Sequence, residues 1–146
     1  MLSTVMELPL TPESALAGLP FGTPRDAVRS FIGGHPREFR RWPEADDRPS
    51  DYWPDLGIFA YYDSADTLEA LELAASAQPI LAGHVLTSLP LQKAKELLRT
   101  FDTEIEIEED GYQVTSKKLG VGLWSGEGPH GIVQAVMKFA PGYYDQ

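Results

Sequence analysis

Two short stretches of this sequence resemble each other, and this internal similarity constrains the fold more than any other feature. Residues 56–61 read LGIFAY and residues 119–124 read LGVGLW, and each phrase is followed, after a turn, by a second apolar run. A proline also precedes a helix-like segment ahead of each copy, at Pro24 and at Pro90. Self-similarity at a fixed spacing marks a duplicated supersecondary unit. The sequence therefore predicts two tandem units.

Hydrophobic periodicity predicts one helix in each unit, followed by strands. The first helix begins at Thr23, which can cap it, with Pro24 in its first turn and a Gly33-Gly34 stop. Apolar residues at three- and four-residue steps predict the second helix from about 90 to 101. Strands are predicted at 38–42, 56–62, 68–73, 104–108, 112–115, 119–124 and 132–139, with a short extended piece near 80–81.

Hairpin turns between successive strands indicate an α+β fold with antiparallel sheet. We expect two tandem helix-plus-antiparallel-strand units that share or adjoin a curved sheet, with the helices on one face. The units cover about 20–75 and about 85–140 of a single domain, residues 1–146.

Strand alternation assigns side chains to the two faces of this sheet. The face expected to meet the helices carries Leu56, Ile58, Ala60, Leu119, Val121 and Leu123. The opposite face would display Tyr61, Trp124, Glu72, Gln134 and Lys138, with Phe59 beside them. Aromatic rings mixed with polar groups on a rigid face are typical of a protein-binding surface. The alternative is that loops or the C-terminal tail cover these aromatic residues.

The charge of the chain limits its partners. The formal net charge is −10, and no lysine or arginine occurs between residues 49 and 92. This balance disfavours nucleic acid and anionic membrane as partners, because both attract basic surfaces, and it suits a basic protein. The absence of cysteine excludes disulfides and thiol chemistry. The first residues lack the pattern of a signal peptide and no apolar run approaches bilayer length, so we expect a cytoplasmic protein.

No motif in the chain predicts a reaction, a cofactor or a metal site. Residues 126–131 match G-x-G-x-x-G, but a strand follows where a dinucleotide fingerprint needs a helix, so we expect a hairpin loop. The three histidines lie far apart and lack metal-ligand spacing. The alternative to a non-enzymatic protein is an enzyme or small-molecule binder with its site in a cleft between the units. That site would contain His35, His84 and His130 with Arg40 or Arg41.

Three glutamates alternate with isoleucines at Glu104, Glu106 and Glu108. On a strand they would project from one face at intervals of about 7 Å. Two interpretations remain open. The glutamates either protect an exposed edge strand against aggregation or form an acidic stripe that docks a basic partner.

Residues 19–28, which read LPFGTPRDAV, resemble the start of a helix-and-sheet module in two known families. One is the small outer-membrane assembly lipoproteins, in which a phrase of glycine, threonine and valine starts the helix. The other is the β-lactamase inhibitory proteins, which repeat the module twice and bind an enzyme with a concave sheet face. This chain has no export signal, no cysteine and one predicted helix per unit, so binding residues of those families do not transfer. The ending at 139–145 resembles small bacterial proteins of toxin–immunity loci.

These observations favour a non-enzymatic acidic protein-binding module, of the bacterial immunity or inhibitor type, that masks a toxin or enzyme. We expect a monomer or homodimer. Acidic inhibitors associate quickly with basic targets because opposite charges steer the encounter. The expected partner-binding residues are Tyr61, Glu72, Trp124, Glu104, Glu106 and Glu108.

Overall fold

The computed structural model describes residues 6–40 and 49–145. These residues form two α-helices and three antiparallel sheets of eight, two and two strands. The elements are β1 (Ser14–Leu16), β2 (Leu19–Pro20), α1 (Arg25–Ile32), β3 (Arg37–Phe39), β4 (Ser50–Trp53), β5 (Ile58–Tyr62), β6 (Leu68–Ala74), η1 (Ala75–Ala77), β7 (Ile80–Leu81), β8 (His84–Val85), η2 (Leu86–Ser88), α2 (Leu91–Arg99), β9 (Glu106–Ile107), β10 (Gln113–Ser116), β11 (Val121–Trp124), β12 (Ala135–Phe139) and η3 (Tyr143–Asp145). The predicted class, α+β with an antiparallel sheet, is confirmed.

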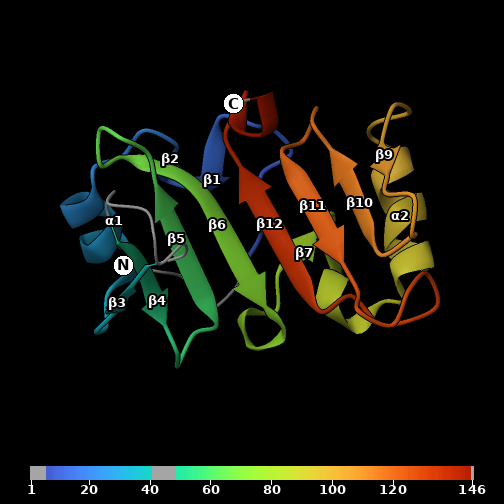
Figure 1. The fold of residues 1–146 in the computed structure, drawn as a ribbon, viewed down its shortest axis with the longest axis horizontal. Coiled ribbons are helices and arrows are strands. Elements are labelled where there is room, and N and C mark those ends of the chain that lie inside the picture. The colour runs from blue at the N-terminus through green and yellow to red at the C-terminus, as the bar shows by residue number, and fades with distance from the viewer. Residues whose placement is uncertain (1–5, 41–48, 146) are drawn as a thin grey trace.

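The eight-stranded sheet dominates the molecule and faces the viewer in Figure 1. Its strand order is β3-β4-β5-β6-β12-β11-β10-β9, so the chain forms one meander on each side of the β6–β12 pair. These two strands pair antiparallel from Ala135↔Ala74 to Phe139↔Ala70. The sheet is therefore continuous where the first half of the chain meets the second.

Two glycines hold matching positions at the starts of neighbouring strand pairs. The Ala74 N–H donates to the Gly57 carbonyl at 2.9 Å, and the Phe139 N–H donates to the Gly120 carbonyl at 2.9 Å. Both glycines have φ of +70°, a region that disfavours other residues. A Cβ on Gly120 would also lie 2.6 Å from the Phe139 carbonyl oxygen. Gly120 therefore requires glycine for both conformation and space, and Gly57 requires it for conformation.

The apolar side chains fall into two clusters. The main core contains buried residues of both helices and of the sheet, among them Val28, Ile32, Leu91, Ala94, Leu98, Ile58, Leu71, Leu73, Val121, Leu123 and Val136. A smaller cluster contains Tyr61, Ala70 and Phe139, with Phe39, Phe59, Met137 and Tyr143 packed against it. Because neighbouring strand residues point to opposite faces, the two clusters lie on opposite faces of the sheet.

Both predicted helices are present, with shorter bounds, but the predicted cap is wrong. Thr23 donates its hydroxyl to the Pro20 carbonyl at 2.6 Å, and Pro24 occupies the N-cap position without a side-chain hydrogen bond. The glycine stop is confirmed, because the Gly33 N–H donates to the Arg29 carbonyl and Gly33 has φ of 81°. Among the described residues, neither helix has the length and apolarity needed to cross a membrane.

The strand predicted over 104–108 is mostly wrong. Only Glu106 and Ile107 pair with β10, and β9 is the outermost strand at that edge. Glu104 lies in a turn, where its N–H donates to the carboxylate of buried Asp102 at 2.9 Å. This local side-chain bond competes with the sheet ladder and shortens the strand. Of the strand predicted over 38–42, residues 41 and 42 lie outside the described residues.

Lys138 was expected on the outward face, and this expectation is wrong. Its side chain is fully buried, and its strand partners Leu71 and Val121 belong to the main core. The Nζ atom donates to the carbonyls of Thr11 at 2.8 Å and Leu119 at 3.0 Å. A buried ammonium group needs such acceptors, and they come from backbone segments that strand alternation does not reveal.

Candidate functional site

A groove lies on the sheet face opposite the main core, over β6, β12, β11 and β10. It is a hollow of about 400 Å³. Its lining residues are Glu72, Gln113, Gly122, Leu123, Trp124, Ala135, Met137 and Tyr144. We call this feature the Glu72–Trp124 groove, after the charged residue and the large exposed aromatic residue that it contains.

One row of cross-strand neighbours runs through the groove and across the whole sheet. Successive ladder partners give the order Arg37, Tyr52, Phe59, Glu72, Met137, Gly122, Thr115 and Glu106. All eight side-chain positions therefore lie on the same face. Gly122 has no side chain, and a Cβ at its position would lie 3.5 Å from Met137 Cβ and 4.0 Å from Thr115 Oγ1. Gly122 and Met137 both line the groove.

Glu72 supplies the charge of the groove. Its side chain is half-buried, and its Oε1 accepts a hydrogen bond from the Tyr61 hydroxyl at 2.7 Å. No described residue donates a hydrogen bond to the second oxygen, Oε2. Because the tyrosine fixes one oxygen, the carboxylate has a restricted orientation and still offers acceptor positions to a ligand.

Two aromatic side chains form the exposed walls of the groove. Trp124 is 45% exposed although it lies on a regular strand, and Tyr144 is 42% exposed. The Tyr144 ring packs edge-on against Phe139, with centroids 4.7 Å apart. A large aromatic side chain held on a rigid element provides contact area at low entropic cost.

The structure brings Tyr61, Glu72 and Trp124 to one face of the sheet and places the three glutamates of the predicted stripe outside the groove. Glu72 and Trp124 line the same groove. Tyr61, expected to be displayed, is only 6% exposed; its ring contacts Phe39 edge-on with centroids 6.3 Å apart. The C-terminal turn covers part of this face through Tyr143, which stacks on Phe139. The C-terminal turn thus lies on Phe139, which is not among the aromatic residues predicted for this face, and Trp124 remains exposed.

The three glutamates of the predicted acidic stripe lie outside the groove. Glu104, Glu106 and Glu108 are all exposed. Glu106 forms an ion pair with Lys117 at 3.6 Å, and both side chains are at least half exposed. Its ladder partner Thr115 neighbours Gly122, so Glu106 shares the face that contains the groove. Among the three glutamates, Glu106 is the residue that strand pairing places on the groove-bearing face.

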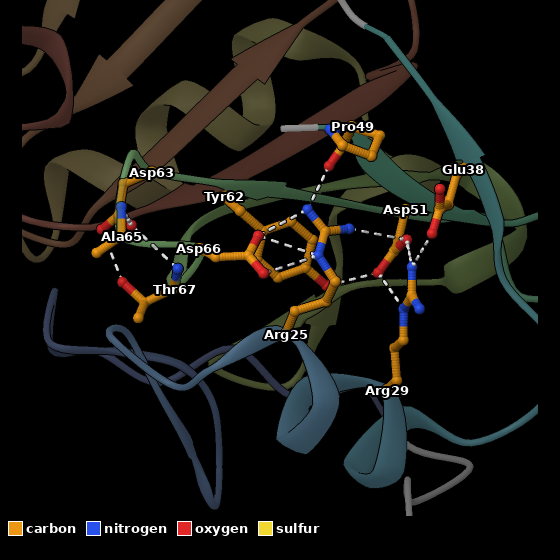
Figure 2. A network of polar contacts seen from close by, with 10 residues as sticks. All are labelled: Arg25, Arg29, Glu38, Pro49, Asp51, Tyr62, Asp63, Ala65, Asp66 and Thr67. Atoms are coloured by element: carbon orange, nitrogen blue, oxygen red, sulfur yellow. Dashed lines mark hydrogen bonds and ion pairs between the residues drawn. The ribbon is translucent and has the colours of Figure 1, made fainter. Parts of the chain in front are cut away.

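A buried polar network on the helix side of the sheet was not predicted (Figure 2). Its centre is Asp51 of β4, which is fully buried. Arg29 of α1 donates from Nε to Asp51 Oδ2 at 2.8 Å and from Nη2 to Oδ1 at 2.6 Å. Arg25 donates to Asp51 Oδ1 at 3.2 Å, and the Tyr62 hydroxyl donates to Oδ2 at 2.8 Å. These contacts attach the first helix to β4 and β5, beside the edge strand β3.

The charged and polar side chains of this network neutralise and hydrogen-bond one another. Burial, followed by the hydrogen bond to Asp51, raises the pKa of Tyr62, and the same carboxylate raises the pKa of Arg29. The Arg25 guanidinium also lies 4.1 Å from the Tyr62 ring centroid and bonds Asp66 at 2.8 Å. In the described parts of the chain, no buried side-chain nitrogen or oxygen lacks a partner. The network therefore holds α1 in place and offers no unpaired group to a ligand.

The residues of the alternative site occupy separate elements. His35 and Trp53 line a hollow of about 270 Å³. Neither of the other two histidines lines this hollow. His84 lies on β8, His130 lies in the loop between β11 and β12, and Arg41 lies outside the described residues. Within residues 6–40 and 49–145, no group of three or more histidine, aspartate or glutamate residues could hold a metal ion. The glycine-rich stretch at 126–131 is part of a hairpin connection, as predicted.

A further hollow, of about 680 Å³, lies beside the turn between β5 and β6. Asp63 lines it, but the carboxylate of this residue is engaged within the turn. It accepts hydrogen bonds from the Ala65 and Thr67 N–H groups, both at 3.0 Å, and from the Thr67 hydroxyl at 2.7 Å (Figure 2). These hydrogen bonds stabilise the turn of the hairpin. The carboxylate of Asp63 therefore has a structural role at the rim of this hollow.

Comparison with models of known protein families, with curated proteins and with solved structures gave no match.

Proposed function

We propose that this chain is a non-enzymatic protein-binding module that captures a basic partner on the groove-bearing face of its sheet. In this proposal it acts as an immunity or inhibitor protein that masks a toxin or enzyme. The observation that carries the proposal is the exposed indole of Trp124 beside the hollow at Gly122. Exposed tryptophan on a rigid strand is characteristic of the energetic centres of protein interfaces.

The proposed architecture consists of two tandem units with both helices against one face of the shared sheet. It is supported by the order of elements, since a two-stranded hairpin, a helix and a four-strand meander occur twice along the chain. Matching isolated bridges support it too, because Pro24 pairs with Thr67 and Pro90 pairs with Ile132. Both helices contribute to the main core, which leaves the opposite face to a partner.

The proposed partner is basic because the chain is strongly acidic. The formal net charge is −10, and Glu72 and Glu106 lie on the groove-bearing face. Opposite charges on two proteins raise the rate of their encounter and disfavour wrong partners. An acidic inhibitor of a basic enzyme or toxin would use the charge for fast association and the tryptophan for affinity.

The test uses the full chain as bait in lysate of its own host, with two matched variants. Trp124→Ala removes the aromatic wall, and Leu10→Ala removes an equally exposed apolar side chain, 44% against 45%, outside the groove. We expect one basic protein to be retained by the native chain and by Leu10→Ala and lost with Trp124→Ala. The purified pair should then form a stoichiometric complex in light scattering. Retention of every captured protein by Trp124→Ala would refute the proposed surface.

A further inference from the structure

We infer that the Glu72–Trp124 groove receives one arginine side chain projected by the partner protein. This inference rests on the proposed function, because it names the chemistry that the same face would recognise. The hollow of about 400 Å³ falls at the lower end of the range, about 300–1,000 Å³, that is usual for ligand pockets. It is large enough for one long side chain.

The charge of the groove selects a cation. Of the eight described residues that line it, Glu72 alone carries a carboxylate, and none is a lysine, arginine or histidine. The Tyr61 hydroxyl occupies one acceptor position on Oε1, while Oε2 receives no hydrogen bond from the described residues. A half-buried carboxylate with unused acceptor positions is best satisfied by a charged donor. An anionic or neutral apolar ligand would leave it without that partner.

The walls of the groove select arginine over lysine. Guanidinium groups stack on aromatic faces and donate through a planar fork, whereas an ammonium group is a compact, strongly hydrated charge. The Trp124 indole provides the aromatic face, and the Gln113 amide oxygen is a second acceptor opposite it on β10. Met137 and Ala135 provide an apolar floor for the methylene stem of the arginine.

The strand spacing agrees with the reach of one arginine. Glu72 on β6 is in register with Gly122 of β11, two residues before Trp124, so two strand spacings and a two-residue offset, about 12 Å in all, lie between the backbones of Glu72 and Trp124. Both side chains line the same hollow and so shorten that gap. An extended arginine entering between them can contact the carboxylate with its guanidinium while its plane meets the indole.

The first experiment needs no partner. A short blocked peptide with one central arginine is titrated into the labelled protein by NMR, and peptides with citrulline or lysine at the same position serve as controls. Citrulline keeps the shape of arginine and removes its charge. We expect saturable shifts of the Trp124 indole N–H and the Glu72 amide with the arginine peptide, and weaker shifts with both controls. Equal shifts with all three peptides, or none with arginine, would overturn the inference.

Variants then separate this inference from the proposed function. Glu72→Gln keeps the hydrogen-bond acceptor and removes the charge, and Asp55→Asn makes the same charge change at an exposed turn. We expect Glu72→Gln to raise the Kd of the captured partner about tenfold or more, with Asp55→Asn near the native value. If Trp124→Ala loses the partner but Glu72→Gln keeps native affinity, the arginine inference fails and the proposed function stands. If neither substitution changes capture, the proposed function itself fails.

Discussion

Lys138 makes the stability of this protein rise with pH in the alkaline range. Its side chain is buried on the main-core face of the sheet, where the Nζ atom donates hydrogen bonds to the carbonyls of Thr11 and Leu119. Desolvation lowers the pKa of Lys138 from 10.5 to about 8, and the nearby charge of Glu13 opposes this decrease. The folded protein therefore holds the lysine proton less tightly than the unfolded chain does.

The sign and size of the effect follow from proton linkage. Below pH 8 both states carry the charge, and the folded state bears the whole cost of burying it. The difference between 10.5 and about 8 corresponds to about 3 kcal/mol. Between pH 8 and 10.5 the unfolded chain binds more protons than the folded protein, so the free energy of unfolding increases with pH. Above pH 10.5 both states are neutral at this position and the cost has disappeared.

Urea unfolding at several pH values tests this reasoning, with Lys138→Met as the perturbation. Methionine keeps the length of the side chain and removes the titrating group, while the unpaired carbonyls it leaves cost the same at every pH. We expect the native-minus-variant free energy of unfolding to rise by about 1 to 2 kcal/mol from pH 8 to pH 9.5. The exposed neighbour Lys118, changed to methionine, is the control and should retain the native pH profile. A native-minus-Lys138→Met difference that stays constant over this range would refute the reasoning.

Three further predictions concern the network, a turn and the acidic stripe. Asp51→Asn should lower the free energy of unfolding by about 3 kcal/mol or more, because two guanidinium groups lose their buried counter-charge; a loss in urea unfolding below about 1 kcal/mol would count against this. Ala82 has φ of 48° in the two-residue turn between β7 and β8, a backbone conformation that asparagine adopts more easily than alanine. Ala82→Asn should therefore raise the free energy of unfolding by about 0.5 kcal/mol, and a lower Tm of the variant would contradict this reasoning. Changing Glu104, Glu106 and Glu108 to lysine should slow association with the basic partner about tenfold or more at low salt. An unchanged stopped-flow rate would remove them from the steering surface.

The elements that the sequence predicted well are those whose apolar pattern decides their burial. Both helices, the β5–β6 hairpin and the β11–β12 pair have apolar residues at the period of their structure. Strand β4 was missed because its fully buried centre, Asp51, reads as a loop residue. Its burial depends on Arg25 and Arg29 of α1, which are far away in the sequence. Periodicity cannot reveal a charge that is buried because a distant segment pairs with it.

The candidate site shows the same division between local and distant information. Alternation correctly placed Glu72 and Trp124 on one face, since this depends only on neighbouring residues. It did not predict that Tyr61 would be buried, because the side chains that cover it come from β3 and from the C-terminal part of the chain. The exposure of a side chain on a sheet face depends on which other segments of the chain cover that face. The sequence of the strand does not indicate which segments these are.

The two similar phrases of the sequence differ at a position that lines the groove. Aligning LGIFAY with LGVGLW places Phe59 opposite Gly122 and Tyr61 opposite Trp124. In the first copy the Phe59 ring stacks on Tyr52, with centroids 4.2 Å apart, and fills the face of the sheet. In the second stretch the corresponding Gly122 has no ring to contribute, and it lines the groove together with the exposed Trp124. The main-chain hydrogen bonds at Gly57 and Gly120 match, so the two stretches differ here in their side chains: Phe59 packs on Tyr52, whereas Gly122 lines the groove.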